Sequence, residues 1–543
     1  MSSAATPRDD MARTGGQIVV EELRAAGVST IYCVPGESYL AVIDALYDVQ
    51  SDIRLVSCRH EGGAVMMAAA TAHLTGRAGV AFVTRGPGAT NGSIGVHIAR
   101  QASLPLVLGV GQVARRNRGR ESFQEVDFET YFKPIAKAVR EVSDPADIGA
   151  AVAEAVDLAE SGRQGPVVLA FPEDVLSEVA AAQSSARVTT PASDLPPGHW
   201  SDVARLMESA VRPVAIVGGG PWSDSACHAI EVFSERLRLP VFSAFRRADC
   251  FDNHHSGYAG FLGLATAASA WERLAESDCV LAIGTRLDEP TTRDYEFPRA
   301  DQTVIHIHPD ASQIGLNVGV DAGIVASVET AAAALAALSL EPQHDWSSWR
   351  DRVRNDFIAS EAPPVSTGAL DLGAVMSILN DAVPANSIVT TDAGNFTAWP
   401  LRYRRYARPG RLLAPVNGAM GYGVPSAVAA SLQYPERTVI GCVGDGGMLM
   451  TGMELATALQ YGASPVILVF NNNKYGTIDM HQQRHYPGRD YGNALVNPDF
   501  AALAQSFGAF GVQVRRTDEF ADALAGALAS GRAAVIELVM DAP

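Results

Sequence analysis

Oxygen-bearing side chains follow two consecutive apolar runs in the C-terminal part of the sequence. Asp445 stands between glycines, directly after the apolar run 438–443 and before a helix-like segment at 448–460. The next apolar run, 465–470, ends in three asparagines. Two strands joined by a helix form a βαβ crossover, so the strands should be parallel and close neighbours. The spacing predicts that the carboxylate and the amides meet at the carboxyl edge of a sheet, where open α/β sheets bind ligands.

These residue types suit a magnesium site that also holds a diphosphate. Carboxylate and amide oxygens are hard ligands for Mg²⁺, which usually keeps waters and substrate phosphates in its other positions. Gly444, Gly446 and Gly447 let the backbone approach an anion, and the N-terminus of the following helix favours a phosphate. At a lone GDG turn the aspartate more often caps the helix, but the asparagines after the next strand favour metal ligation by Asp445.

The elements that must position these residues repeat along the whole chain. Short β-rich apolar runs alternate with alanine-rich helical stretches, which predicts an α/β protein. Two stretches rich in proline, serine and small polar residues, 180–199 and 339–368, are typical of exposed connectors that bury little, the second with one short helix. We therefore expect three doubly wound parallel-sheet domains, at 1–185, 195–340 and 360–543, the first and last being variants of one plan.

The composition limits the class of protein. With a net charge of −18 and a pI of about 5.1, the chain is not expected to bind nucleic acid, which needs lysine and arginine to neutralise phosphates. The six cysteines are scattered without a CxxC pair, so neither a disulfide framework nor a zinc knuckle is expected. The polar N-terminus and the lack of an apolar run of about 18 residues predict a cytoplasmic protein without membrane association.

A GDG turn followed at this distance by an asparagine pair is similar to the binding motif of thiamine-diphosphate enzymes. The chain from about Thr14 to Pro543 resembles their acetolactate synthase (acetohydroxyacid synthase) and pyruvate oxidase branch. The resemblance implies a pyrimidine-binding first domain, a central domain and a diphosphate-binding last domain. It also implies thiamine diphosphate and Mg²⁺ as cofactors, with Mg²⁺ held by Asp445, Asn472 and the main-chain carbonyl of Lys474.

Two catalytic residues follow from the resemblance. The segment "RLVSCRHEGGAVMMA" carries Glu61, the counterpart of a buried carboxyl group that protonates N1′ of the cofactor's aminopyrimidine. Alone, Glu61 would be interpreted as an acid in the first turn of a helix, favoured by the helix dipole. In "GRESFQEVD", Gln124 matches a glutamine close to the reacting carbon.

Other motifs of the family imply cofactor contacts in the last domain. In "PVNGAMGYGVP", Gly418 would offer its carbonyl to the 4′-amino group and Met420 would lie beneath the two rings. Without the resemblance, Met420 would be interpreted as a core residue. In "TTDAGNF", the backbone at Asn395 and Phe396 would lie near the diphosphate.

The implied activity is decarboxylation of a 2-oxo acid such as pyruvate, followed by ligation of the remaining fragment to a second carbonyl compound. A non-ligating decarboxylase and a lyase of 2-hydroxyacyl thioesters stay open as alternatives. A non-catalytic cofactor-binding subunit is disfavoured by the intact set Glu61, Asp445 and Asn472, and a nicotinamide dehydrogenase rests on the α/β pattern alone. The resemblance also implies a homodimer or homotetramer in which Glu61 and Asp445 of different subunits act on one cofactor.

Several residues depart from the acetolactate synthase pattern. Pro290 takes the place of the arginine that grips the second substrate's carboxylate, with Arg293 as a candidate substitute. His481 takes the place of a tryptophan that shapes the acceptor pocket, and Glu37 stands where the family has a small residue. The identities of donor and acceptor therefore stay open.

The central domain gives two weaker signals. The turn "VGGGPWS" has Ser223 at the third glycine of a GxGxxG pattern, so FAD, ADP and no ligand at all remain alternatives for this domain. His306 and His308 could point the same way from one strand and bind a metal. Ordinary strand residues are the favoured interpretation, because no third ligand is evident.

Overall fold

The computed structural model describes residues 12–181 and 198–540, apart from 365, 367 and 409. By its internal packing the chain divides into two units. The first holds residues 1–72 and 77–190, and the second holds 73–76 and 191–543. Three six-stranded sheets, each parallel throughout, confirm the predicted α/β class, whereas the domain bounds at 185, 195, 340 and 360 stay predictions.

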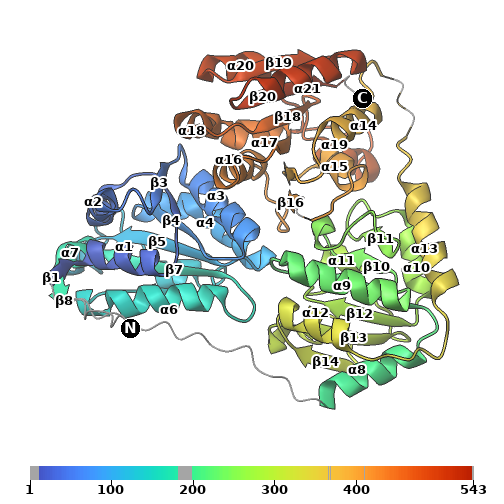
Figure 1. Cartoon of the computed structure of the whole chain (residues 1–543). Helices are drawn as coiled ribbons and strands as arrows, with labels where there is room; N and C mark the ends of the chain where they lie inside the picture. Colours follow the sequence, from blue (N-terminus) through green and yellow to red (C-terminus); the bar gives the residue numbers. More distant parts are fainter. Residues whose placement is uncertain (1–11, 182–197, 365, 367, 409, 541–543) are drawn as a thin grey trace, which may run out of the picture. The chain divides into compact units, whose positions relative to one another are not determined.

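The sheet of the first unit has the strand order β3-β2-β4-β5-β7-β6. Its strands are β2 (Thr30–Cys33), β3 (Arg54–Ser57), β4 (Gly79–Val83), β5 (Leu106–Gln112), β6 (Ala138–Glu141) and β7 (Pro166–Pro172). Helices α1 (Gly15–Ala25), α2 (Leu40–Asp48) and α6 (Ile148–Glu160) cover one face, and α3 (Glu61–Thr75) and α4 (Gly86–Ala102) the other (Figure 1). The winding reverses between β2 and β4, so a ligand crevice is expected beyond their carboxyl ends.

The second sheet, which belongs to the second unit, has the order β11-β10-β9-β12-β13-β14. Its strands are β9 (Pro213–Val217), β10 (Val241–Ser243), β11 (Tyr258–Phe261), β12 (Cys279–Ile283), β13 (Thr303–His308) and β14 (Ala322–Val325). Strands β9, β12 and β13 are buried almost throughout and consist largely of valine, isoleucine and leucine, as expected for parallel strands covered on both faces. Numbered along the chain this is the order 3-2-1-4-5-6 found in dinucleotide-binding sheets.

The third sheet, also in the second unit, has the order β16-β15-β17-β18-β20-β19. Its strands are β15 (Ile388–Thr391), β16 (Arg411–Leu413), β17 (Val439–Gly444), β18 (Val466–Asn471), β19 (Phe510–Val514) and β20 (Ala534–Val539). Counted along the chain, this order is identical to that of the first sheet, which confirms that the first and last blocks follow one plan. The winding reverses between β15 and β17, and these two strands should carry the ligand site.

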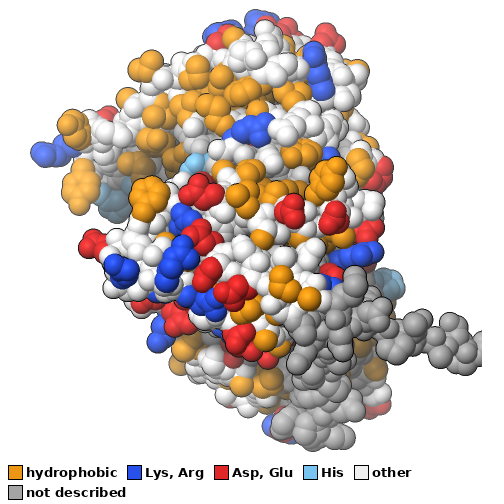
Figure 2. Space-filling view, turned by 90° about the vertical axis from the view of Figure 1, so that its left-hand side faces the viewer, with side chains coloured by type: hydrophobic (Ala, Val, Ile, Leu, Met, Phe, Trp, Pro, Cys, Tyr) orange, Lys and Arg blue, Asp and Glu red, His pale blue; other side chains and the backbone are white. Residues whose placement is uncertain are grey.

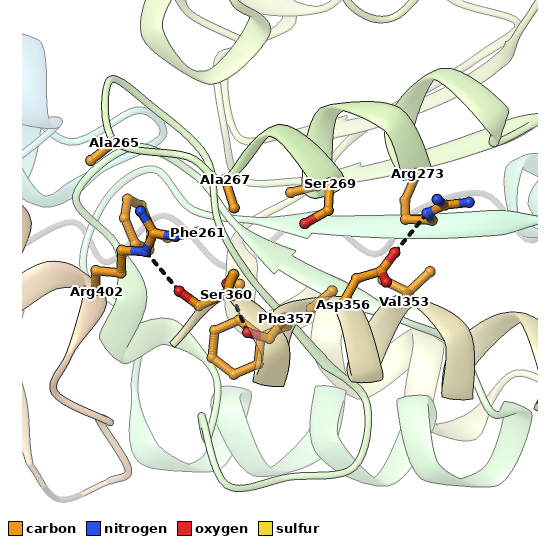
Figure 3. A pocket seen from close by; sticks show the side chains of 13 residues that line it. Phe261, Ala265, Ala267, Ser269, Arg273, Val353, Asp356, Phe357, Ser360 and Arg402 are labelled. Carbon is orange, nitrogen blue, oxygen red and sulfur yellow. Dashed lines mark hydrogen bonds and ion pairs between the residues drawn. The ribbon is translucent and has the colours of Figure 1, made fainter. Parts of the chain in front are cut away.

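The connector 339–368 contains the expected helix, α13 (Ser347–Ser360), but the prediction that it buries little is wrong. Trp346 and Trp349 are buried, and their indole nitrogens donate to the carbonyls of Ala210 and Pro213 at 2.9 Å. Figure 3 shows α13 across a cavity of about 20 Å³, room for about one water. Beside it Arg273 pairs with Asp356 at 2.8 Å, and Arg402 donates to the Ser360 carbonyl. Tryptophan anchors thus make this connector part of the second unit.

The surface agrees with the acidic composition. On the face drawn in Figure 2, lysine and arginine side chains lie among aspartates and glutamates rather than in a continuous basic stripe. Among the described residues, no helix is long and apolar enough to cross a membrane. The six cysteines are all buried as free thiols, which confirms that they form no disulfide framework.

Candidate functional site

The predicted βαβ crossover around Asp445 is present. β17 and β18 are parallel neighbours, with Gly444 opposite Phe470. Between them lie α17 (Asp445–Thr451), the short 3-10 helix η7 (Gly452–Glu454) and α18 (Leu455–Tyr461), so the helix begins earlier than the expected residue 448 and is interrupted. Asp445, only 4% exposed, is the first residue of α17. The structure therefore brings this carboxylate and the asparagines to the same sheet edge.

A network of amides holds the Asp445 carboxylate. Its Oδ1 accepts from the Gly446 N–H at 2.9 Å and its Oδ2 from Asn497 Nδ2 at 2.8 Å. Burial, the largest cause, raises the pKa of Asp445, and these hydrogen bonds oppose that shift. Asn497 Nδ2 also donates to Asn471 Oδ1 at 2.9 Å, which ties the two strand ends together. Sequence reasoning missed Asn497, because it lies in a loop far along the chain with no motif around it.

The donor set fits a hard divalent cation. Besides Asp445, the predicted ligands Asn472 and Lys474 line the same cavity, and Asn472 Oδ1 accepts from the Lys474 N–H at 3.2 Å. The buried Oδ1 of Asn497 has no hydrogen-bond partner among the residues described, as expected for an oxygen left for an ion or its water. Carboxylate, amide and carbonyl oxygens are what Mg²⁺ prefers.

The cavity next to these oxygens has a volume of about 530 Å³. This size is within the range of sites for cofactors and small molecules. Ten residues predicted from the sequence line it: Asn395, Phe396, Gly418, Met420, Gly444, Asp445, Gly446, Gly447, Asn472 and Lys474. Apolar side chains that the sequence had not indicated, among them Trp399, Ile478 and Met480, complete the wall. One cavity thus combines a polar, oxygen-lined end with an apolar body.

Backbone turns bring two loops close together at this cavity. Gly418 and Gly421 have φ values of +73° and +82°, which glycine adopts without strain. A Cβ on Gly446 would lie 2.5 Å from Tyr475 Cε1 and 3.2 Å from Met420 Cε. A side chain at position 446 would therefore displace the Tyr475 ring, and glycine lets the GDG turn lie against it.

Asp392, which sequence reasoning missed, links the same two loops. It follows β15 directly, is fully buried, and its Oδ1 accepts from the Tyr422 N–H at 3.1 Å. Its Oδ2 lies 1.9 Å from where a Cβ of Gly447 would be. Burial raises the pKa of Asp392 to about 6, against hydrogen bonds from Gly421, Tyr422 and Ala393. The carboxylate is therefore held between the Gly418–Gly421 turn and the start of α17.

The pKa of Asp392 predicts a pH dependence of stability. Its folded pKa of about 6 exceeds the unfolded value of about 3.9, so the native state binds more protons between these values. This contribution to the free energy of unfolding is largest below pH 4 and falls, by up to about 3 kcal/mol, as pH rises to 6. Asp392→Asn should therefore gain stability relative to the wild type between pH 4 and pH 7.5. Urea unfolding of both proteins at the two pH values measures this, and an unchanged difference would contradict it.

Gly447→Ala should damage the cofactor site. The added methyl group would overlap Asp392 Oδ2, so the carboxylate or α17 must shift. We expect destabilisation of about 1–3 kcal/mol, as in other overpacked sites. We also expect about tenfold weaker binding of thiamine diphosphate with Mg²⁺, by isothermal titration calorimetry. Gly319→Ala is the matched control, because a Cβ there meets nothing within 4 Å. Equal binding by both variants would contradict the prediction.

Glu61 and Gln124 lie in the first unit. Glu61 begins α3, its Oε2 accepts from Asn91 Nδ2 at 3.0 Å, and a Cβ on Gly88 would lie 3.4 Å from its Oε1. The sequence predicted a buried carboxyl group, but in this single chain the Glu61 side chain is half-buried. The reason is that the contacts given above all come from α4. Gln124 accepts from the Gly86 N–H through its main-chain carbonyl at 2.9 Å. Both residues therefore lie at the N-terminal end of α4.

Pro290 and His481, two of the residues that depart from the acetolactate synthase pattern, lie on helices. Pro290 lies in the first turn of α11 (Glu289–Thr292). Arg293, which follows, lies over the Trp271 ring at 5.9 Å and pairs with Glu296 at 3.5 Å. His481 on α19 (Gly476–His485) stacks on His485, while Ile478 and Met480 of that helix line the cavity.

The two signals from the central domain involve buried side chains. His306 and His308 are buried; His306 Nε2 bonds to the Thr285 carbonyl, and His308 Nδ1 accepts from the Asp310 N–H at 3.0 Å. The described residues contain no group of three or more histidine, cysteine, aspartate or glutamate side chains that could hold a metal. In the glycine turn after β9, Trp222 Nε1 donates to the Gly218 carbonyl and Arg247 Nε to that of Gly219. These two bonds use main-chain carbonyls and leave FAD, ADP and no ligand as the predicted alternatives for this domain.

Comparisons with known proteins agree with this geometry. Family models of thiamine pyrophosphate enzymes match the N-terminal TPP binding domain at residues 13–131, the central domain at 200–337 and the C-terminal TPP binding domain at 392–538. The acetolactate synthase large subunit of Parasynechococcus marenigrum is 33% identical, over 97% of this chain and 87% of that protein. A probable acetolactate synthase large subunit of Methanocaldococcus jannaschii is 32% identical, over 97% and 92%. The large subunit of Escherichia coli acetolactate synthase isozyme 3 is 32% identical, over 95% and 92%. The chain therefore belongs to the family of thiamine pyrophosphate enzymes.

Proposed function

We propose that this protein is a thiamine-diphosphate- and Mg²⁺-dependent carboligase. It would decarboxylate a 2-oxo acid such as pyruvate and ligate the remaining fragment to a second carbonyl compound. The observation that carries the proposal is one cavity whose lining combines the buried carboxylate of Asp445 and the amide of Asn472 with apolar side chains. Relatives named acetolactate synthase, similar over nearly the whole chain, support the reaction class.

Each group of residues has a distinct task in this proposal. Asp445, Asn472 and the Lys474 carbonyl would hold Mg²⁺, and the N-terminus of α17 would face the diphosphate; all of these residues line the cavity. The Gly418 carbonyl would accept a hydrogen bond from the aminopyrimidine, and Met420 would contact the cofactor rings. When bound, thiamine diphosphate supplies a nucleophilic carbon and an electron sink. The carboxyl group of Glu61 holds a proton at N1′ of the cofactor, and Gln124 contacts the substrate.

The oligomer is part of the proposal. A homodimer or homotetramer would allow Glu61 of one copy and Asp445 of another to act on one cofactor, as in the family this chain resembles. Static light scattering after gel filtration measures the mass. A monomer that is nevertheless fully active would contradict this arrangement.

A carbon-13 NMR time course tests the reaction. Labelled pyruvate is incubated with the protein, thiamine diphosphate and Mg²⁺, and larger 2-oxo acids follow in parallel. Labelled acetolactate supports carboligation, whereas acetaldehyde alone indicates a decarboxylase that does not ligate. Cofactor binding without consumption of any 2-oxo acid would overturn the proposal and favour a non-catalytic subunit. A change in A340 with a nicotinamide cofactor would instead indicate a dehydrogenase.

A further inference from the structure

A buried arginine lies at the ligand-binding edge of the first sheet. Arg85 follows β4 and precedes α4, whereas Glu37 follows β2, and these are the two strands between which the winding reverses. Asp392 and Asp445 have the same places after β15 and β17 of the third sheet. Because ligands of open α/β sheets bind beyond such strand ends, Arg85 belongs to the ligand crevice of its sheet.

The Arg85 side chain is held by three partners. The residue is 8% exposed, and Nη1 donates to Glu37 Oε1 at 3.1 Å while Nη2 pairs with Glu173. Nη1 also reaches Gln124 Oε1 at 3.5 Å. The remaining Nε is buried and has no hydrogen-bond partner within the described part of the chain. These partners fix the Arg85 side chain in place. One of them is Gln124, the residue predicted to lie close to the reacting carbon.

The backbone at Gln124 is also fixed. Gln124 has a φ of +66°, and its carbonyl accepts from the Gly86 N–H at 2.9 Å. Next to it, Glu125 accepts from the N–H groups of Gly119 and Ser122 at 2.6 and 3.0 Å, which lowers its pKa. With the main chain held on both sides, only the side-chain torsions of Gln124 are free to change.

The polarity of the amide then follows from Arg85. A guanidinium group can only donate hydrogen bonds, so the Gln124 atom that faces it must be the oxygen. The amide nitrogen, with two N–H donors, must point to the other side. Without the arginine, the two ends of the amide would have no such preference.

We propose that Arg85 is a positioning residue that makes Gln124 a hydrogen-bond donor to an oxygen of the 2-oxo acid substrate. This inference rests on the proposed function and adds the direction of the hydrogen bond. Glu37 competes for the same Nη1, and its side chain is 67% exposed. Glu37 therefore weakens the hold of Arg85 on Gln124, and Glu37→Gln should strengthen it.

A double-mutant cycle tests the inference with the 2-oxo acid that the wild type consumes. Gln124→Met, which removes the donor, should lower kcat/KM about 100-fold, as the loss of one preorganised donor does elsewhere. Arg85→Met should lower it about tenfold in the wild-type background and leave it unchanged in the Gln124→Met background. The same tenfold loss in both backgrounds would overturn the inference, because Arg85 would then act independently of Gln124.

Controls separate positioning from folding. Arg140→Met removes a surface arginine of the same unit that pairs with Glu154 at 3.1 Å, and it should keep full activity. Arg85→Lys retains the charge without the forked geometry and should lose about threefold, with the affinity for thiamine diphosphate unchanged. A large loss of that affinity in both Arg85 variants would indicate a structural role and overturn the proposal.

A second readout does not depend on turnover. In crystals of the protein without cofactor, the Gln124 oxygen should face Arg85 in the wild type, and the side chain should occupy several rotamers in Arg85→Met. If the wild type consumes no 2-oxo acid, the proposed function fails, but these crystals still decide whether Arg85 orients Gln124. A single unchanged Gln124 conformation in Arg85→Met would overturn the inference.

Discussion

Asp445→Ala is expected to weaken binding of thiamine diphosphate with Mg²⁺ by more than about 100-fold and to abolish turnover. Substitution of residues that only support a metal ligand already costs about 10–100-fold, so the loss of a direct ligand should cost more. The change also removes the hydrogen bond of 2.8 Å between Asn497 Nδ2 and the carboxylate. The link that Asn497 makes between the ends of β17 and β18 is thereby weakened. Titration calorimetry with thiamine diphosphate, at fixed Mg²⁺, measures the affinity.

The control for this prediction is Asp522→Ala, an exposed aspartate on α21 (Phe520–Ala529) of the same unit. It should bind the cofactor as the wild type does. If Asp445→Ala retains Mg²⁺-dependent binding at the wild-type affinity, Asp445 is a helix cap and the metal lies elsewhere. A unit that is unfolded by the substitution would be recognised by a lost urea transition. In that case Asp445→Asn, which can keep the hydrogen bond from the Gly446 N–H, replaces it.

The placement of the oxygen-bearing residues at one end of the cavity could be predicted because their spacing in the sequence is local. A βαβ crossover fixes the relation between two strand ends, so the sequence alone places Asp445 and Asn472 at one edge of a sheet. Gly444, Gly446 and Gly447 also follow from local rules about turns and helix N-termini.

The residues that were missed depend on tertiary packing. Asn497 reaches Asp445 from a loop beyond β18, and Asp392 reaches Gly447 from β15, the neighbouring strand. Asn497 lies 52 residues from Asp445, and Asp392 lies 30 residues from Tyr422, so no local motif marks either side chain. Arg85 was missed for the same reason, because Glu37, Gln124 and Glu173 approach it from three separate segments. The connector was misjudged because its composition is polar, although its two tryptophans are buried.

The first and third sheets have the same strand order and carry their candidate site residues at equivalent strand ends. In each sheet the third strand along the chain ends directly at a helix N-terminus, with Arg85 before α4 and Asp445 at the start of α17. At the third sheet this end carries a carboxylate that we propose binds Mg²⁺, and at the first it carries a guanidinium group that contacts Gln124. Equivalent positions in the two sheets thus carry groups of opposite charge, Arg85 and Asp445. This difference is consistent with separate tasks for the two sheets.

Glu61→Gln is expected to slow the exchange of the cofactor's C2 proton with deuterated water by about 10²–10⁴-fold, the usual contribution of a positioned acid or base. Glutamine keeps the shape of Glu61 and can still bond to Asn91, but its amide cannot hold and return a proton at N1′. NMR of the bound cofactor after acid quench measures the exchange.

The control is Glu154→Gln, at an exposed ion pair on α6. Its cofactor should exchange the C2 proton as in the wild type, since exposed ion pairs contribute little. Because proton exchange precedes any reaction with substrate, the measurement separates Glu61 from the choice of donor and acceptor. Wild-type exchange in Glu61→Gln would assign the activating carboxyl group to another residue.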